Sequence, residues 1–314
     1  MSGEFERIRQ IAESLGARAR GLGDDCAVLA PGDGRLLLST DTSVDGVHFR
    51  LDWITHREMG WRAAASALSD LAAGGAGAAG VLAAIVLPDT ASDEELVAVM
   101  DGVGDASAAS GAVVLGGDLS GGPSWAVTIT VAGWAVRPVT RTGARPGDGV
   151  WVTGVLGAAR AALETWRRHE EPAPDARSAF AHPVPRIGAG QWLASAGARA
   201  MIDLSDGLGG DIRHLAERSG VAIALDLDAV PVALACHDEA RRLGVTTQQF
   251  AAEGGEDYEL LVALPPEFDE GSAKSFAREC GLPITRVGVV RAGAGVRALS
   301  GGRPIELKGY DHFR

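Results

Sequence analysis

Lysine is nearly absent from this chain: Lys274 and Lys308 are the only two among its 29 basic residues, and neither lies in a glycine-rich loop. A Walker A loop and a protein-kinase strand both place a lysine on a nucleotide phosphate, so the sequence excludes these two kinds of nucleotide site. A protein of this composition that used ATP would neutralise the phosphates mainly with metal ions and arginine. The net charge of −12 also disfavours a nucleic-acid partner, because phosphate contacts need clustered Lys and Arg.

Cysteines and long apolar runs are also scarce. Cys26, Cys236 and Cys280 lie far apart and form no CxxC pair, so we expect neither a disulfide framework nor a structural zinc site. The uncharged stretch over residues 71–88 is interrupted by four glycines and closed by Pro88, which fits a helix, a turn and a strand better than a membrane span. The first ten residues carry charges of both signs and no apolar secretory core. We therefore expect a cytoplasmic protein without a membrane partner.

The length of 314 residues and the alternation of apolar segments predict two domains of mixed α/β (α+β) architecture. A turn-rich stretch over residues 137–148 marks the boundary, which divides the chain into 1–137 and 138–314. Strands are predicted over residues 35–40, 81–87, 112–115, 125–136, 150–153, 200–204, 221–227, 258–264 and 284–290. Helices are predicted over residues 57–73, 93–110, 156–168 and 208–217. We expect a mobile loop over 170–176 and a hairpin with an ordered tail over 301–314.

Six acidic clusters stand in small-residue turns, and three of them directly follow apolar strands. They contain Asp25, Asp41, Asp70, Asp118, the pair Asp203 and Asp206, and the segment 254–257. Loops converge at strand ends in open α/β sheets, so these carboxylates can gather there. Gathered carboxylates repel one another unless cations lie between them, and Mg²⁺ binds carboxylates, water and substrate phosphates. The pattern indicates metal-assisted phosphate chemistry.

Each of these signals also has a plainer interpretation. Aspartate beside glycine is common turn chemistry, and Asp24, Asp45 and Asp211 can serve only as turn or cap residues. The glycine pair 116–117 would let backbone amides approach a phosphate, and Ser205 precedes a helix whose amino end favours an anion. Taken together, these features indicate a nucleotide site without a P-loop.

These segments together resemble the thiamine-monophosphate kinase family, in the superfamily that includes aminoimidazole ribonucleotide synthetase. The matching segments follow the family order over essentially the whole chain, at residues 3–5, 23–27, 39–42, 46–49, 68–73, 115–118, 140–144, 202–208, 254–260 and 309–313. The resemblance implies a homodimer whose amino-terminal sheets pair across the interface, with a carboxy-terminal α/β domain completing the site. It also implies direct, Mg²⁺-dependent transfer of the ATP γ-phosphoryl group to thiamine monophosphate, with no phosphoenzyme.

The resemblance further implies roles for individual residues. The residues that would hold or position magnesium are Asp25, Ser39, Thr40, Asp41, Asp70, Asp118, Asp203 and Asp206. Those that would contact ATP are Gly117, Asp118, Arg141 and Ser205, and those that would contact thiamine monophosphate are His48, Glu256 and Tyr310. The expected catalytic residues are Asp41, Asp118 and Asp206. His48 could instead be a packing residue, and Tyr310 could only anchor the tail.

Other functions remain open at this point. The superfamily contains aminoimidazole ribonucleotide synthetase, selenophosphate synthetase and a carbamoyl-dehydrating hydrogenase maturation factor. The absence of lysine from the amino-terminal region argues against the second, and the ending His312-Phe313-Arg314 lacks the reactive cysteine of the third. A non-catalytic nucleotide-binding relative would be expected to lose some of the six aspartates. The chain departs from the kinase pattern at Ala67, Gly74 and Leu119, which flank acidic residues without removing any.

Overall fold

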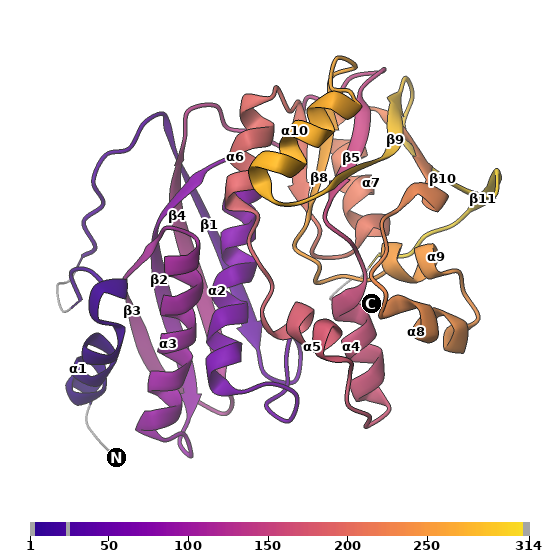
Figure 1. Ribbon diagram of the computed structural model, residues 1–314. Coiled ribbons are helices and arrows are strands. Elements are labelled where there is room, and N and C mark those ends of the chain that lie inside the picture. The colour runs from indigo at the N-terminus through magenta and orange to yellow at the C-terminus, as the bar shows by residue number, and fades with distance from the viewer. Residues whose placement is uncertain (1–3, 23–25, 310–314) are drawn as a thin grey trace. The chain divides into compact units, whose positions relative to one another are not determined.

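The computed structural model describes residues 4–22 and 26–309. The chain forms two compact units, Met1–Leu71 with Ala76–Val136, and Ala72–Gly75 with Arg137–Arg314. Within the described ranges, no helix combines the length and the apolar character that a membrane crossing requires. Figure 1 traces the chain by colour from one unit into the other.

The first unit is built on a four-stranded sheet with helices on one face (Figure 1). Its described elements are α1 (Glu4–Leu15), η1 (Gly16–Arg18), β1 (Arg35–Val44), α2 (His56–Ala73), β2 (Gly77–Pro88), α3 (Asp93–Ala109), β3 (Val113–Gly122) and β4 (Ala126–Ala135). The strand order is β1-β4-β2-β3. Strand β4 is antiparallel to β1 and β2, whereas β3 is parallel to β2. Strands β1 and β3 are therefore the edges of this sheet.

Helices α2 and α3 lie side by side over the sheet because glycines bring their backbones together (Figure 1). A Cβ at Gly60 would lie 1.9 Å from the carbonyl oxygen of Val99, and one at Gly102 would lie 1.9 Å from that of Arg57. Alternate residues of β4 over 127–131 are buried, as expected for a strand with one face on a core. The two helices thus cover one face and leave the other face of the sheet open within this unit.

The second unit contains a mixed seven-stranded sheet in the order β11-β10-β7-β9-β5-β8-β6. Its elements are β5 (Gly149–Thr153), α4 (Ala158–Arg167), α5 (Pro174–Ala181), α6 (Ile187–Ser195), β6 (Ala200–Asp203), α7 (Leu208–Ser219), β7 (Ala222–Asp226), η2 (Leu227–Ala229), α8 (Cys236–Leu243), α9 (Thr247–Ala252), β8 (Leu260–Leu264), α10 (Glu270–Cys280), β9 (Ile284–Arg291), β10 (Gly295–Ser300) and β11 (Arg303–Ile305). Neighbouring strands are antiparallel except β7 and β10, which are parallel.

Three strands at one end of the second sheet are buried along their whole length. Every residue of β5, β6 and β8 is buried, which agrees with their nearly continuous apolar sequences. On one face, Trp151 of β5 packs edge-on against Phe268 with ring centroids 5.0 Å apart, and Trp192 of α6 packs on Phe276 of α10 at 5.3 Å. This core fixes β6, and therefore the direction in which the β6–α7 turn leaves the sheet.

The predicted mixed α/β class is confirmed, and each predicted strand and helix is found with shifted boundaries. The largest boundary error is at the end of β3, which continues to Gly122. Strand β1 also continues past its predicted end, to Val44, and both strands pair with a neighbour over the added residues. The prediction of a loop over 170–176 is wrong from Pro174 onward, where α5 begins with proline at an early helical position that suits it.

The predicted hairpin near the end of the chain starts earlier than residue 301. Strands β10 and β11 pair around Gly301 and Gly302, whose φ angles of 55° and 75° are those of a tight two-residue hairpin turn. Residues 310–314 of the expected tail lie outside the described residues.

Candidate active site

Asp41 and Asp118 do not follow the ends of strands, contrary to the prediction. Asp41 lies within β1 opposite Ile129, and Asp118 lies within β3 beside Ala84. The backbone alone makes the ladder hydrogen bonds, so polar side chains can continue an edge strand whose side chains face solvent. Both aspartates are exposed, and the Asp41 carboxylate accepts a hydrogen bond from the Thr42 N–H at 2.9 Å.

The strand register places these two carboxylates on opposite faces of the sheet. One row of paired residues across the four strands contains Asp118, Ala84, Thr128 and Thr42. Asp41 belongs to the adjacent row, and side chains of successive residues in a strand point to opposite faces. The Thr42 and Thr128 hydroxyls are 2.9 Å apart in the same row as Asp118.

The predicted magnesium residues of β1 are divided in the same way. Ser39 donates a hydrogen bond to Asp70 of α2 at 2.5 Å, which links the strand to the helix. Asp41 follows two residues later and shares the face of Ser39. The hydroxyl of Thr40 lies on the other face, 3.1 Å from that of Thr130. The structure therefore brings Ser39, Asp41 and Asp70 to one face and turns the Thr40 side chain away from them.

The glycine pair 116–117 was expected in a turn, and this prediction is wrong. Both residues lie inside β3, where Leu115 is the extra residue of a bulge and Gly116 has φ 156°. A Cβ at position 117 would lie 1.8 Å from the carbonyl oxygen of Ala83 on the neighbouring strand. Close strand packing already requires glycine at position 117, so its contact with ATP stays a prediction.

His48 lies in the turn that follows β1. Its Nδ1 accepts a hydrogen bond from the Val44 N–H at 3.1 Å, which leaves Nε2 as the protonated nitrogen of a neutral ring. The next residue, Phe49, is only 1% exposed and anchors the turn in the core. His48 itself is half-buried and closes the turn, and its contact with substrate stays a prediction.

The β6–α7 turn carries a buried acidic cluster. Asp203 ends β6 and is 4% exposed, Asp206 follows in the turn, and Asp211 in the first turn of α7 is 2% exposed. The Asp211 carboxylate accepts a hydrogen bond from the Asp206 N–H at 3.2 Å. Burial, and then the charges of Asp203 and Asp206, raise the pKa of Asp211 to about 8. This concentration of negative charge makes the turn a favourable place for a cation.

Three further predicted residues belong to the same neighbourhood. Ser205 lies in the turn, and its carbonyl oxygen accepts a hydrogen bond from the Glu256 N–H at 2.8 Å. The positive charge of Arg141 lowers the pKa of Asp211, although burial and the neighbouring carboxylates raise it by more. The Arg141 guanidinium therefore lies close enough to interact electrostatically with the acidic cluster. The structure therefore gathers residues predicted for metal, ATP and substrate around one turn of the second unit.

Asp25 and Tyr310, two other predicted site residues, lie outside the described residues. In the part of the chain that the structure describes, no three acidic, histidine or cysteine side chains are already grouped as a metal ion needs. The candidate donors nevertheless fit magnesium, because they are carboxylates and hydroxyls with no thiolate among them. The unfavourable proximity of Asp203, Asp206 and Asp211 is what a bound cation would relieve.

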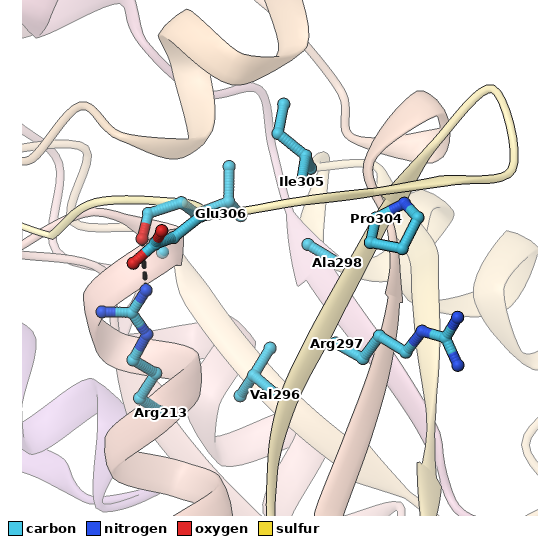
Figure 2. Close-up of a pocket in the computed structure, with 9 residues that line it drawn as sticks. Arg213, Val296, Arg297, Ala298, Pro304, Ile305 and Glu306 are labelled. Carbon is cyan, nitrogen blue, oxygen red and sulfur yellow. Dashed lines mark hydrogen bonds between the residues drawn. The ribbon is translucent and has the colours of Figure 1, made fainter.

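A separate hollow of about 320 Å³ lies between α7, β10, β11 and the segment that follows β11 (Figure 2). Arg213 and Arg297 on its walls point away from each other, and Arg213 donates a hydrogen bond to the carbonyl oxygen of Leu307. None of the predicted site residues lines it. The segment beyond Leu307 leads to Gly309, where a Cβ would lie 3.8 Å from the carbonyl oxygen of Asp206.

Sequence reasoning missed Asp211, which was interpreted as a turn or cap residue, and did not single out Tyr258. Asp211 had a signal of its own, because it is an acidic residue in the first turn of a helix that starts beside two other aspartates. Tyr258 donates a hydrogen bond to Glu256 at 2.7 Å, a contact between nearby residues that no sequence rule anticipates.

Family models account for most of the chain. Residues 23–136 match the model described as AIR synthase related protein, N-terminal domain. Residues 145–300 match the model described as AIR synthase related protein, C-terminal domain. The two matches fall on the two units described above.

Individual proteins are similar over nearly the full length. The thiamine-monophosphate kinase of Escherichia coli strain K12 is 37% identical over 323 residues, which cover 98% of this chain and 95% of that protein. The crystal structure of thiamine-monophosphate kinase from Stenotrophomonas maltophilia K279a has a TM-score of 0.83 and 31% identity, covering 92% of this chain and 95% of that one. The structure of AaThiL complexed with AMPPCP and TMP has a TM-score of 0.81 and 32% identity, and the match covers 99% of this chain and 97% of that one. The chain therefore belongs to the thiamine-monophosphate kinase family of AIR synthase-related proteins.

Proposed function

We propose that this protein phosphorylates thiamine monophosphate with ATP, giving thiamine diphosphate and ADP. The observation that carries the proposal is the nearly full-length similarity to AaThiL, whose structure is that of a complex with AMPPCP, an ATP analogue, and TMP. The β6–α7 turn supports it independently, because carboxylates, a serine and an arginine gather there around one strand end.

The acceptor in this reaction is a phosphate oxygen that is already ionised at neutral pH, so the protein needs no strong general base. Its task is to hold two anions in line and to exclude water from between them. Arg141 suits this role, because a guanidinium forms two parallel hydrogen bonds with a phosphate. Ser205 and Gly117 would orient the ATP phosphates. We propose direct transfer of the γ-phosphoryl group, without a phosphoenzyme.

We propose magnesium as the metal. The carboxylates that would hold it are those of Asp25, Asp41, Asp70, Asp118, Asp203 and Asp206. Ser39 would help from the face that it shares with Asp41, and Thr40 from the face that it shares with Asp118. Bound ions would supply positive charge to the phosphates during transfer. We assign a catalytic role to Asp41, Asp118 and Asp206, which would hold the ions that stabilise the phosphates during transfer.

We assign His48, Glu256 and Tyr310 to thiamine monophosphate, whose thiazolium ring carries a positive charge that Glu256 would offset. Residues 1–137 would then bind ATP and magnesium and form the dimer contact, and residues 138–314 would complete the site. The cysteines at 26, 236 and 280 are free, which is consistent with the proposed cytoplasmic location.

We further propose a homodimer formed through the four-stranded sheet. Its open face carries Leu38, which is 65% exposed, Leu36 at 45% and Leu82 at 37%. Side chains of this size are rarely left in water on one sheet face unless a partner covers them. Replacing Leu38 with Glu should shift the protein from dimer to monomer in light scattering coupled to gel filtration. An unchanged dimer would place the contact elsewhere.

Phosphorus NMR of the purified protein with ATP, Mg²⁺ and thiamine monophosphate tests the reaction directly. We expect thiamine diphosphate and ADP to accumulate in equal amounts, and neither to form without the acceptor. ADP with free phosphate would indicate another ATP-using member of the superfamily. Binding of ATP without any turnover would indicate a non-catalytic relative.

A further inference from the structure

The segment over residues 254–259 has an unusual backbone. Glu256 and Tyr258 have φ angles of 71° and 51°, in the left-handed region that residues other than glycine rarely adopt. Among the described residues, His169 is the one other non-glycine residue with a positive φ. Such a conformation persists only where neighbouring contacts fix it.

Those contacts come from the β6–α7 turn. The Glu256 N–H donates to the Ser205 carbonyl oxygen at 2.8 Å, and the Tyr258 N–H donates to the Leu204 carbonyl oxygen at 2.9 Å. The two backbones approach closely because of glycine: a Cβ at Gly255 would lie 2.4 Å from the Ser205 oxygen. The segment is therefore fixed relative to the acidic turn by its main chain.

The acidic side chains of this segment differ sharply in environment. Glu259 is 3% exposed, pairs with Arg186 at 2.6 Å and accepts a hydrogen bond from Thr153 at 2.5 Å. The Asp257 carboxyl group is buried, accepts from the Gly157 N–H at 2.8 Å, and burial raises its pKa well above the usual range. Neither group is available to a ligand. Glu256 is the remaining carboxylate, and its residue is partly exposed.

Tyr258 fixes this remaining carboxylate. Its side chain is nearly buried, with 7% of the residue exposed, and its hydroxyl donates to Oε2 of Glu256 at 2.7 Å. A glutamate side chain otherwise samples many rotamers and loses that freedom on binding a ligand. A hydrogen bond from a buried ring removes most of that freedom before the ligand arrives, which favours binding.

We propose that Tyr258 is a positioning residue that orients the Glu256 carboxylate toward the cationic ring of the substrate, and thereby sets the preference for a charged ring. The inference rests on the proposed function, in which Glu256 faces thiamine monophosphate. Tyr258 itself touches neither substrate nor metal in this account. It acts only through the direction that it gives to Glu256.

Tyr258→Phe removes the hydroxyl and keeps the ring, and two acceptors separate its possible roles. One is thiamine monophosphate, and the other is a neutral analogue in which carbon replaces the charged ring nitrogen. We expect kcat/KM for thiamine monophosphate to fall about tenfold, mainly through a higher KM, which is the size expected for one hydrogen bond to a charged group. The KM for ATP and the kcat/KM for the neutral analogue should stay close to wild type.

Equal losses for both acceptors would show that the hydroxyl only supports the loop and would overturn the proposal, as would no loss for thiamine monophosphate. The wild-type reaction, followed in the same assay, keeps the two claims apart. If the wild type makes no thiamine diphosphate, the proposed function fails. If it does and Tyr258→Phe behaves like wild type, only the role of Tyr258 fails.

Glu256→Gln provides a second variant that keeps a hydrogen-bond acceptor for Tyr258 but removes the charge. We expect it to lose the preference for the charged acceptor even when its thermal unfolding matches wild type. Adding Tyr258→Phe to Glu256→Gln should change kcat/KM by less than twofold, because the two side chains act as one unit. Full additivity of the two effects would contradict the inference.

Discussion

The aspartates of the four-stranded sheet and those of the β6–α7 turn occupy opposite electrostatic environments. Asp41 and Asp118 are exposed on edge strands, where water solvates their charges. Asp203 and Asp211 are 4% and 2% exposed, and burial together with neighbouring charges raises the pKa of Asp211 to about 8. Burial therefore disfavours the ionised form of Asp211, whereas Asp41 and Asp118 lie on exposed edge strands.

This difference separates what each region needs from a ligand. The carboxylates of Asp41 and Asp118 are exposed, so we expect their replacement to leave the fold intact. The buried carboxylates of the turn store repulsion that a cation or a proton must relieve. The glycines differ too: Gly117 permits strand pairing inside the sheet, whereas Gly255 permits a loop to cross the acidic turn.

The largest expected effect is on turnover. Asp118→Asn or Asp41→Asn should lower kcat by about a hundredfold or more, because each removes a charge proposed to bind the metal ions. The free energy of unfolding should change by about 0.5 kcal/mol or less, since both residues are exposed. Steady-state release of ADP and urea unfolding measure the two quantities. Wild-type rates in either variant would contradict the metal assignment.

Next in size is a change in the stability of the sheet. Gly117→Ala should lower the free energy of unfolding by about 3 kcal/mol, because its Cβ would lie 1.8 Å from the Ala83 carbonyl oxygen. Gly121→Ala is the matched control on the same strand, since its Cβ would lie no closer than 4.0 Å to the Asp89 side chain. Urea unfolding of both variants tests this, and similar midpoints would count against the packing explanation.

The third prediction concerns pH, in metal-free protein. The folded-state pKa of Asp211, about 8, lies above its ordinary value of 3.8, so the folded state keeps a proton that the unfolded state has lost. The stability of the wild type should therefore fall as pH rises from about 4 to about 8. Asp211→Asn should flatten this dependence and be the more stable protein at the upper end.

Urea unfolding across that pH range, with a chelator and then with Mg²⁺, measures the effect. We expect Mg²⁺ to stabilise the wild type more than Asp211→Asn at the upper end of this pH range, because the Asp211 carboxyl group ionises there and the variant has no carboxylate at this position. Identical pH slopes for the two proteins would show that Asp211 does not titrate in this range. Identical slopes would also contradict the contrast drawn between the exposed aspartates of the four-stranded sheet and the buried aspartates of the β6–α7 turn.

The smallest effect is expected near the end of the chain. A Cβ at Gly209 would lie 2.4 Å from the Lys308 carbonyl oxygen, so Gly209→Ala must push the segment over 307–309 away from α7. This segment can shift more easily than a central strand, so we expect a loss of about 1 kcal/mol. Hydrogen exchange at 307–309 should accelerate. Gly188→Ala in α6, with nothing within 4 Å, is the control, and equal exchange in both would contradict the contact.

The sequence predictions were accurate where neighbouring residues determine the structure, and inaccurate where pairing with a distant strand determines it. The helix over 57–73 and the buried strand over 258–264 were located correctly within a few residues, because apolar pattern alone marks them. The positions of Asp41 and Asp118 were wrong, because the pairing of β1 with β4 and of β3 with β2 extended both strands past their apolar parts. No local signal reports on a partner strand that is distant in sequence.

The sequence by itself determined the mixed α/β class, the absence of a lysine-based phosphate site and the family to which the chain belongs, because composition and motif order need no coordinates. Only the tertiary structure decided the environment of each carboxylate. It placed Asp41 and Asp118 on opposite faces of one sheet, raised the pKa of Asp211, and set Tyr258 against Glu256. The physical reason is that burial, like-charge repulsion and hydrogen-bond direction depend on distances between segments, which the order of residues along the chain does not contain.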